Sequence, residues 1–218
     1  MPTINRRLFL ASGLAAPALI THRALALPTA PDATQNGGWY KFHLGSFEIT
    51  VVSDGNLVTP TEILGVDQPR EAVTEYLTRH YMDPVSNYAH TNHILVDTGS
   101  ARVLVDVGSG DRFQPSAGRL LDNLEAAGVD PGAITHVALT HAHPDHVWGM
   151  MDDFGDEPRI PAASYAIGAA EFDWWMAPDR LNQVPEQMQA FVVGARNALT
   201  PVREQTAMLA DGAEIVPG

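Results

Sequence analysis

The chain has 218 residues, no cysteine and 45% hydrophobic residues, and its 13 basic and 26 acidic side chains give a formal net charge of −13. This composition suits one globular domain or two small ones. It argues against a nucleic-acid-binding protein, because such proteins need clustered Lys and Arg and Lys41 is the only lysine here. The lack of cysteine excludes disulfide scaffolds, thiolate zinc sites and cysteine nucleophiles, so the nine histidines and the carboxylates are the candidate metal ligands.

Residues 1–26 carry the features of an export signal. Two adjacent arginines precede an apolar stretch that ends at Ile20, and Ala24-Leu25-Ala26 offers small residues at the positions that a signal peptidase reads. The segment resembles a twin-arginine signal, so we expect export to the periplasm, cleavage after residue 26 and no membrane association of the mature protein. Residues 27–38 are rich in Pro, Ala, Asn and Gly and are predicted to form a flexible leader.

The remaining residues, 39–218, alternate strand-like and helix-like segments and predict a single α/β unit. Apolar, β-branched runs bounded by Gly or Asp predict strands, and apolar residues at three- and four-residue spacing predict helices. The predicted strands are 40–44, 47–52, 93–96, 102–107, 134–140 and 160–167, with a turn at 53–56, and the predicted helices are 71–81, 115–127, 169–176 and 186–199.

The main functional motif follows the predicted strand that ends at Thr140. It places three imidazoles and one carboxylate within six residues, His141-Ala142-His143-Pro144-Asp145-His146. Residues two apart in an extended segment face the same side, so His141 and His143 can bind one cation. Pro144 then begins a helix, which would project Asp145 and His146 towards a second cation. Imidazole and carboxylate suit Zn²⁺, Mn²⁺ or Fe²⁺; the alternative is a solvated histidine cluster at a turn.

These residues resemble the His-x-His-x-Asp-His signature of the metallo-β-lactamase superfamily at every position. The likeness extends to the branch that contains methyl parathion hydrolase and related lactonases, through residues 103–108, 118–120 and 171–175. It implies an αββα sandwich and a hydrolase that uses a metal-bridged hydroxide on an ester, lactone or phosphotriester. The implied cofactors are two divalent ions, in the first place zinc, with manganese or iron as alternatives, and the implied partner is a small-molecule substrate.

By the same resemblance, the four residues of the signature divide into two pairs. His141 and His143 would bind one ion, and Asp145 and His146 would bind the other. Asp145 would also be the catalytic residue, because it would orient the attacking hydroxide.

The resemblance also implies roles for three residues outside the signature. Asp106 would support the site from a strand end beneath it, while Phe113 and Trp175 would line an aromatic substrate mouth. Two alternatives stay open for these aromatics. Phe113 could simply anchor the helix that follows it, and only one of Trp174 and Trp175 can face a pocket.

The chain departs from the family after the signature. The family completes its site with further histidines and an aspartate, whereas His146 is the last histidine here. We therefore expect 39–218 to hold the first half of the sandwich and the start of the second, in a truncated chain with little activity alone. An unpaired sheet edge would favour a homodimer. A glyoxalase-type thioesterase, a mononuclear iron dioxygenase and a non-catalytic remnant stay open as alternatives.

Earlier histidines are candidates to replace the missing ligands. His43, His93 and His136 lie within predicted strands, where a histidine most often fills an ordinary position at the edge of the core or at the surface. We therefore assign none of them as a ligand.

Overall fold

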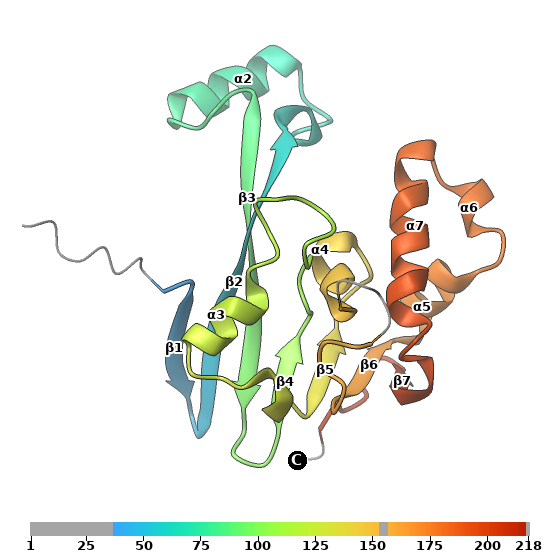
Figure 1. Ribbon diagram of the computed structural model, residues 1–218. Coiled ribbons are helices and arrows are strands. Elements are labelled where there is room, and N and C mark those ends of the chain that lie inside the picture. Colours follow the sequence, from blue (N-terminus) through green and yellow to red (C-terminus); the bar gives the residue numbers. More distant parts are fainter. Residues whose placement is uncertain (1–36, 153–156, 217–218) are drawn as a thin grey trace, which may run out of the picture. The chain divides into compact units, whose positions relative to one another are not determined.

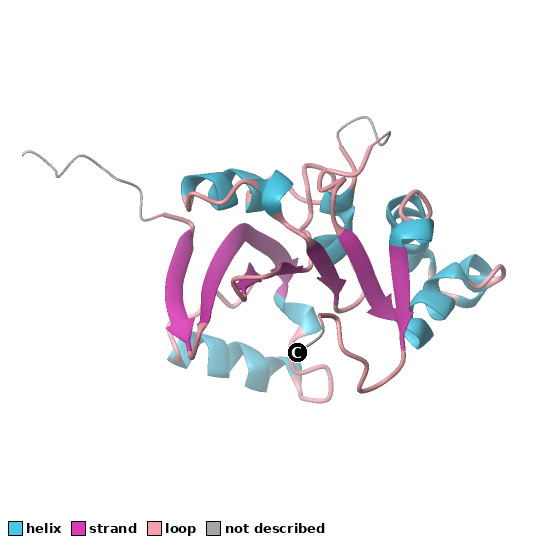
Figure 2. Ribbon diagram, turned by 90° about the horizontal axis from the view of Figure 1, so that it is seen from below, coloured by secondary structure: helices cyan, strands magenta, loops and turns pink. Residues whose placement is uncertain are grey.

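The computed structural model describes residues 37–152 and 157–216, and these residues form one seven-stranded sheet with helices packed against it (Figure 1; Figure 2). The strands lie side by side in chain order, β1 to β7. Strands β1 to β4 pair antiparallel, whereas β4 to β7 pair parallel. The mixed sheet confirms the predicted α/β class, because helices connect the parallel strands.

The elements have the following bounds. The strands are β1 Trp39–Leu44, β2 Phe47–Pro60, β3 Ser86–Asp97, β4 Arg102–Val105, β5 His136–Leu139, β6 Ser164–Gly168 and β7 Thr206–Leu209. The α-helices are α2 Arg70–Arg79, α3 Leu120–Ala126, α4 Pro144–Val147, α5 Ala169–Met176, α6 Arg180–Gln183 and α7 Glu186–Leu199. Short 3-10 turns are η1 Thr61–Ile63, η2 Pro131–Ala133, η3 Trp148–Met150 and η4 Arg203–Gln205.

The predicted export signal and most of the predicted leader lie outside the described residues, so both stay predictions. Gly37 and Gly38 are described, and the Gly38 carbonyl accepts a hydrogen bond of 2.7 Å from the Ser53 N–H. Pairing with β2 therefore begins inside the predicted leader. In the part of the chain that the structure describes, no helix has the length and apolar character to cross a bilayer.

The predicted turn at 53–56 is wrong, because these residues continue strand β2. The register between β2 and β3 shifts between Ser53 and Gly55, so that Asp54 is an extra residue in a bulge. Gly55 has a φ of +113°, and a Cβ there would lie 2.2 Å from the Ser116 carbonyl oxygen. An Asp-Gly pair suits a turn or a bulge equally well, and here the pairing with a long β3 decides for the bulge.

Three other elements begin four or more residues later or earlier than predicted. Strand β3 begins at Ser86 and not at residue 93, because the continued β2 offers it a partner. Helix α3 begins at Leu120 and not at residue 115, and the Leu120 N–H at its start donates to the Asp54 carboxylate. Strand β6 begins at Ser164 and not at residue 160. Element type was predictable from local pattern, and element ends depend on tertiary partners.

The core lies on one face of the sheet. Leu104, Val137 and Tyr165 are adjacent across β4, β5 and β6, and each is at most 1% exposed. They pack in one cluster with buried residues of α3, α5 and α7. Residues that alternate with them point to the opposite face, which is also apolar but more open: Phe42 is 39% exposed and Ile94 is 41% exposed. Helices α3, α5 and α7 therefore cover this face of the sheet.

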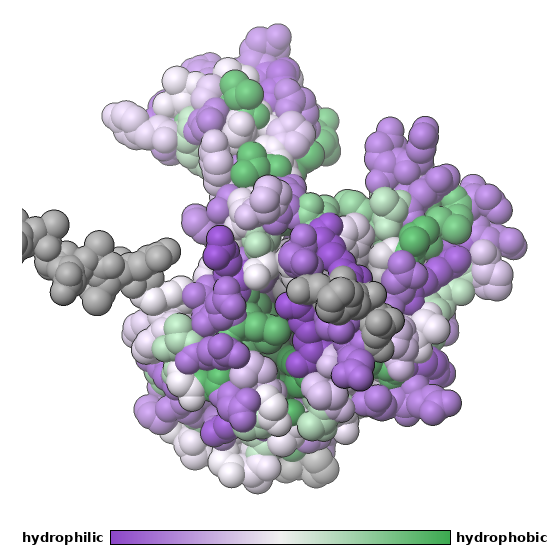
Figure 3. Space-filling model, in the orientation of Figure 1, coloured by the Kyte–Doolittle hydropathy of each residue, from purple (hydrophilic) through white to green (hydrophobic). Residues whose placement is uncertain are grey.

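Strands β2 and β3 extend past their neighbours as a two-stranded arm, and α2 packs at its end (Figure 1). Apolar side chains gather at the surface there, as the green patches at the top of Figure 3 show. Val66 is 83% exposed and Val85 is 71% exposed. The arm carries none of the predicted site residues.

Candidate metal centre

The signature occupies the loop between β5 and α4, at the carboxyl end of a parallel strand. His143 has an extended backbone (φ −69°, ψ 160°) and Pro144 takes the first helical position, where its missing N–H costs nothing. The N–H groups of His146 and Val147 donate to the His143 carbonyl at 3.0 and 3.1 Å and so begin the helix. The residue before a proline disfavours helix, which explains why the chain stays extended to His143 and turns only afterwards.

The structure brings the three imidazoles of the signature together. The ring centroids of His141 and His143 lie 4.7 Å apart, and those of His141 and His146 lie 3.8 Å apart. His141 and His143 also line one cavity, as expected for residues two apart in an extended segment. The three rings therefore form one cluster, in which His141 and His143 of the loop face the cavity and His146 comes from helix α4.

Asp145 and His146 form the second pair of donor atoms. Asp145 Oδ2 lies 3.3 Å from His146 Nε2. Two atoms that bind one tetrahedral ion at about 2.0–2.1 Å lie about 3.3–3.4 Å apart, so this spacing fits a shared cation. Across residues 37–152 and 157–216, no three His, Asp or Glu side chains meet as ligands of a single ion. Asp145 and His146 thus fit one divalent ion as a pair, and the described residues form no complete four-ligand cage.

Asp106 lies beneath the cluster and is only 4% exposed. Its Oδ1 accepts from the Thr140 N–H at 2.7 Å, and its Oδ2 accepts from the Thr140 hydroxyl and pairs with His146 Nδ1, both at 2.8 Å. Because His146 Nδ1 points to Asp106, His146 Nε2 is left facing Asp145. Asp106 adopts a φ of +61°, a left-handed conformation that Asp and Asn tolerate best among residues with a side chain.

Two opposing effects set the charge of His146. Burial alone would lower the pKa of His146, but its hydrogen bonds to Asp106 and Asp145, together with their negative charges, raise that pKa to about 9. For His141, burial and the neighbouring His146 and His143 lower the pKa. One imidazole of the cluster is therefore charged at neutral pH in the metal-free protein, while His141 is neutral.

This difference predicts a pH effect on the stability of the metal-free protein. The pKa of His146 in the folded state lies above its value of about 6.5 in the unfolded chain. The charged His146 therefore stabilises the folded state fully below about pH 6.5, and this stabilisation is lost as the pH rises through about 9. Urea unfolding in the presence of a chelator, from pH 6 to 9.5, should show this loss for the wild type. The His146→Gln variant should show a flatter profile, and two parallel profiles would contradict the prediction.

The two histidines of the loop line a cavity of about 460 Å³, a size that suits a small molecule. Trp175 and Trp174 both line it, although Trp175 is only 2% exposed and Trp174 is 37% exposed. The Arg180 guanidinium covers the Trp174 ring at 4.1 Å. The structure thus brings both the predicted substrate residue Trp175 and its neighbour to the cavity, so the expectation that only one of the two tryptophans can face a pocket is wrong.

Phe113, the other predicted substrate residue, is not among the residues that line this cavity. Its ring packs against those of Trp148 and Phe191, at centroid distances of 5.4 and 5.8 Å. Phe191 in turn lies 6.1 Å from the His143 ring. Phe113 therefore supports an aromatic wall beside His143, and Trp148 and Phe191 of that wall had no predicted role at the site.

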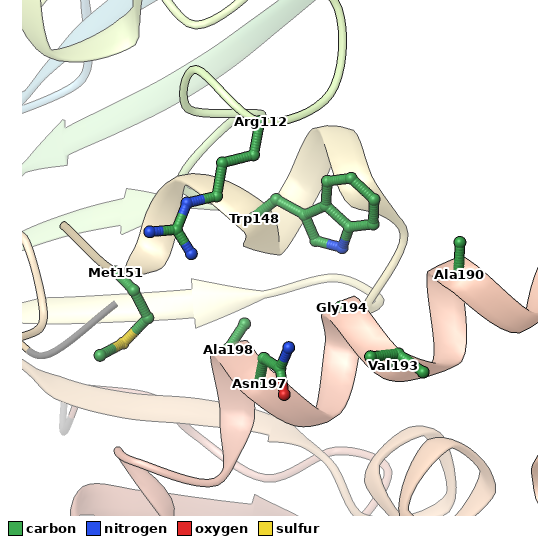
Figure 4. A pocket seen from close by; sticks show the side chains of 8 residues that line it. All are labelled: Arg112, Trp148, Met151, Ala190, Val193, Gly194, Asn197 and Ala198. Carbon is green, nitrogen blue, oxygen red and sulfur yellow. The ribbon is translucent and has the colours of Figure 1, made fainter. Parts of the chain in front are cut away.

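A second cavity, of about 360 Å³, is lined by Arg112, by Trp148 of η3 and by residues of α7 (Figure 4). Figure 4 shows Arg112 and Trp148 facing Val193, Gly194 and Asn197 of α7 across it. None of the four residues of the signature lines this cavity. It is therefore separate from the candidate metal centre.

Two buried polar residues near the centre were not predicted. Asp54 is fully buried, and its carboxylate accepts from the N–H groups of Ser109 and Leu120 at 2.8 and 3.0 Å. His93 is 4% exposed and lies edge-on to His146, with ring centroids 6.1 Å apart. His93 thus occupies a buried core position, and its ring lies beside the cluster. No local signal in the sequence distinguishes either residue from its exposed counterparts.

The sequence comparisons point to one family. Residues 89–186 match the family described as "Metallo-beta-lactamase superfamily". "Thioesterase pkgB" of Emericella nidulans is 38% identical over 77 residues, which are 35% of this chain and 21% of that protein. The chain thus covers about a fifth of the length of the curated relatives it matches.

Solved structures share the fold over more of the chain. The hydrolase AbOPH, described as a member of the beta lactamase superfamily, is 29% identical with a TM-score of 0.72, and the match covers 83% of this chain and 64% of AbOPH. AidC, described as a dizinc quorum-quenching lactonase, is 25% identical with a TM-score of 0.74, covering 81% of this chain and 63% of AidC. The predicted metallo-β-lactamase fold is confirmed, and the described residues form one sheet of it.

Proposed function

We propose that this chain is a metal-dependent hydrolase of the metallo-β-lactamase superfamily, in the branch of the methyl parathion hydrolase and lactonases, and that it acts on an ester, lactone or phosphotriester. One observation carries the proposal. The imidazoles of His141, His143 and His146 gather with Asp145 at the end of β5, above Asp106 and beside a cavity of about 460 Å³. The matches to the superfamily, to AbOPH and to AidC support it.

Two pairs of residues would hold divalent ions: His141 with His143, and Asp145 with His146. Zinc is proposed first, because imidazole and carboxylate are among its usual ligands and AidC is described as dizinc. When bound, such ions supply Lewis-acid polarisation of the substrate and lower the pKa of water to about 7. Manganese or iron would suit the same donors.

Residues of the chain itself would orient the ligands and the attacking water and hold the substrate. Asp106 fixes which ring nitrogen of His146 faces the centre. Asp145, whose Oδ2 lies 3.3 Å from His146 Nε2, would orient the attacking water. The side chains of Trp174, Trp175 and Met188 form an apolar wall that would hold the organic part of a small-molecule substrate and exclude water from it.

Thioester hydrolysis at the same centre is the second candidate. The observation that favours it is the match to a relative named a thioesterase. Both candidates use the same donors, so substrate preference alone separates them.

We also propose, from residues 1–26 alone, that the protein is exported to the periplasm by the twin-arginine route. The acidic composition fits a small-molecule substrate and no nucleic-acid partner.

Metal-dependent turnover tests the proposed function. The purified chain, loaded with zinc, is assayed on an acyl homoserine lactone, an aryl phosphotriester and an acyl thioester. Because the described donors form no complete ligand cage, we expect weak turnover of at least one substrate. A chelator should abolish it, zinc should restore it, and His143→Ala should lower it on the order of 100-fold. His80→Ala, at an exposed histidine that ends α2, is the matched control and should retain wild-type turnover. Turnover that ignores both the chelator and His143→Ala would refute the proposal.

A further inference from the structure

Glu171 joins helix α5 to the loop that carries the two histidines. It lies in the first turn of α5, and its Oε1 accepts a hydrogen bond of 3.0 Å from the Ala142 N–H. The same oxygen accepts from Trp175 Nε1 at 2.5 Å. Ala142 is the residue between His141 and His143, so a contact at its backbone acts on both neighbours.

The loop is held from two sides at Ala142. Its methyl group is fully buried and belongs to the hydrophobic core, while its N–H donates to Glu171 on the side of the cavity. A buried N–H without a partner costs about 1–3 kcal/mol, so the carboxylate favours this one backbone orientation over others. In that orientation the rings of His141 and His143 line the same cavity.

Trp175 keeps the Glu171 carboxylate in place. The two residues are four apart on α5 and so share one face of the helix. Trp175 is 2% exposed, and its indole packs in the core, so its N–H is a fixed donor. The carboxylate also lines the cavity with His141 and His143, where its negative charge favours a cation.

We propose that Glu171 is a positioning residue of the candidate metal centre, which holds the backbone between His141 and His143 and thereby sets the spacing of the two imidazoles. It supplies no ligand itself. The predicted effect of Glu171 on metal affinity rests on the proposed function. Its hydrogen bond to the Ala142 N–H can be tested in the metal-free protein.

The first test measures metal affinity. Glu171→Leu removes the acceptor at similar volume, Glu171→Gln keeps an acceptor oxygen, and Asp173→Asn changes an exposed acid on the same helix. By competition with a chromophoric chelator, Glu171→Leu should weaken Co²⁺ or Zn²⁺ binding about 10- to 100-fold. Glu171→Gln should recover most of the affinity, and Asp173→Asn should match the wild type. Equal affinity in wild type and Glu171→Leu would overturn the proposal.

The second test uses the metal-free protein. Amide hydrogen exchange by NMR should be at least about tenfold faster at Ala142 in Glu171→Leu than in the wild type, with the Trp175 indole N–H also affected. Unchanged exchange at Ala142 would contradict the proposal even in a chain that binds no metal. If Glu171→Leu does not fold, Trp175→Phe replaces it, since it removes the donor that fixes the carboxylate. It should speed exchange at Ala142, and wild-type exchange would refute the positioning role.

Discussion

Replacing Asp106 with alanine is expected to destabilise the metal-free protein by about 3 kcal/mol, because it removes a buried carboxylate that pairs with the partly buried His146. The change also leaves the Thr140 N–H without its acceptor and puts alanine in a left-handed conformation. Urea unfolding with a chelator present measures the loss. Asp106→Asn keeps an acceptor oxygen and tolerates the backbone, so it should lose less stability and isolate the effect of charge.

Zinc affinity should fall in the same order as stability, further in Asp106→Ala than in Asp106→Asn. Without a carboxylate to hold Nδ1, the His146 ring can turn, and Asp106→Asn should weaken zinc binding about 10- to 100-fold. Asp97→Asn is the matched control, because Asp97 also ends a strand but pairs with Arg102 near the surface. A surface pair contributes at most about 1 kcal/mol, so this variant should stay close to wild type. Identical behaviour of the Asp106 and Asp97 variants would contradict the role given to Asp106.

Replacing Asp54 with alanine is expected to lower the free energy of unfolding by about 2–6 kcal/mol, although Asp54 is far from the signature in sequence. The substitution removes a fully buried carboxylate and leaves the N–H groups of Ser109 and Leu120 unpaired, at about 1–3 kcal/mol each. If residues 53–56 formed the predicted exposed turn, Asp54→Ala would change the free energy of unfolding by only about 0.5 kcal/mol, as most surface substitutions do.

The control for Asp54 is Asp83→Ala. Asp83 is an exposed aspartate that accepts from the N–H groups of Val85 and Ser86, two and three residues on. Its bonds are local and solvated, so its loss should cost far less than that of Asp54. If equilibrium unfolding gives similar losses for the two variants, the structural role assigned to Asp54 is wrong.

Much of the centre could be predicted because its geometry is local. The alternation of an extended segment sets His141 and His143 on one side, and Pro144 fixes where the helix begins. The types of most elements were predictable for the same reason: the repeat of apolar residues along the chain reflects one buried face.

Two supports, Asp54 and Glu171, could not be predicted, because each connects residues that are far apart in sequence, whereas Asp106 was identified from the family resemblance. Asp54 binds Ser109 and Leu120 across 55 and 66 positions, and Glu171 binds Ala142 across 29. An Asp-Gly pair in β2 or a Glu at the start of α5 looks locally like an ordinary turn or helix residue. Such roles come from the order of strands in the sheet, which places distant loops at the same edge.

Metal location at atomic resolution tests the central claim most directly. Crystals of the full chain grown with zinc should give an anomalous difference peak about 2.0–2.2 Å from His146 Nε2 and an Asp145 carboxylate oxygen, and a second peak at the same distance from a ring nitrogen of each of His141 and His143. Zinc bound only elsewhere, or these four side chains pointing apart around solvent, would contradict the assignment of a metal-dependent hydrolase.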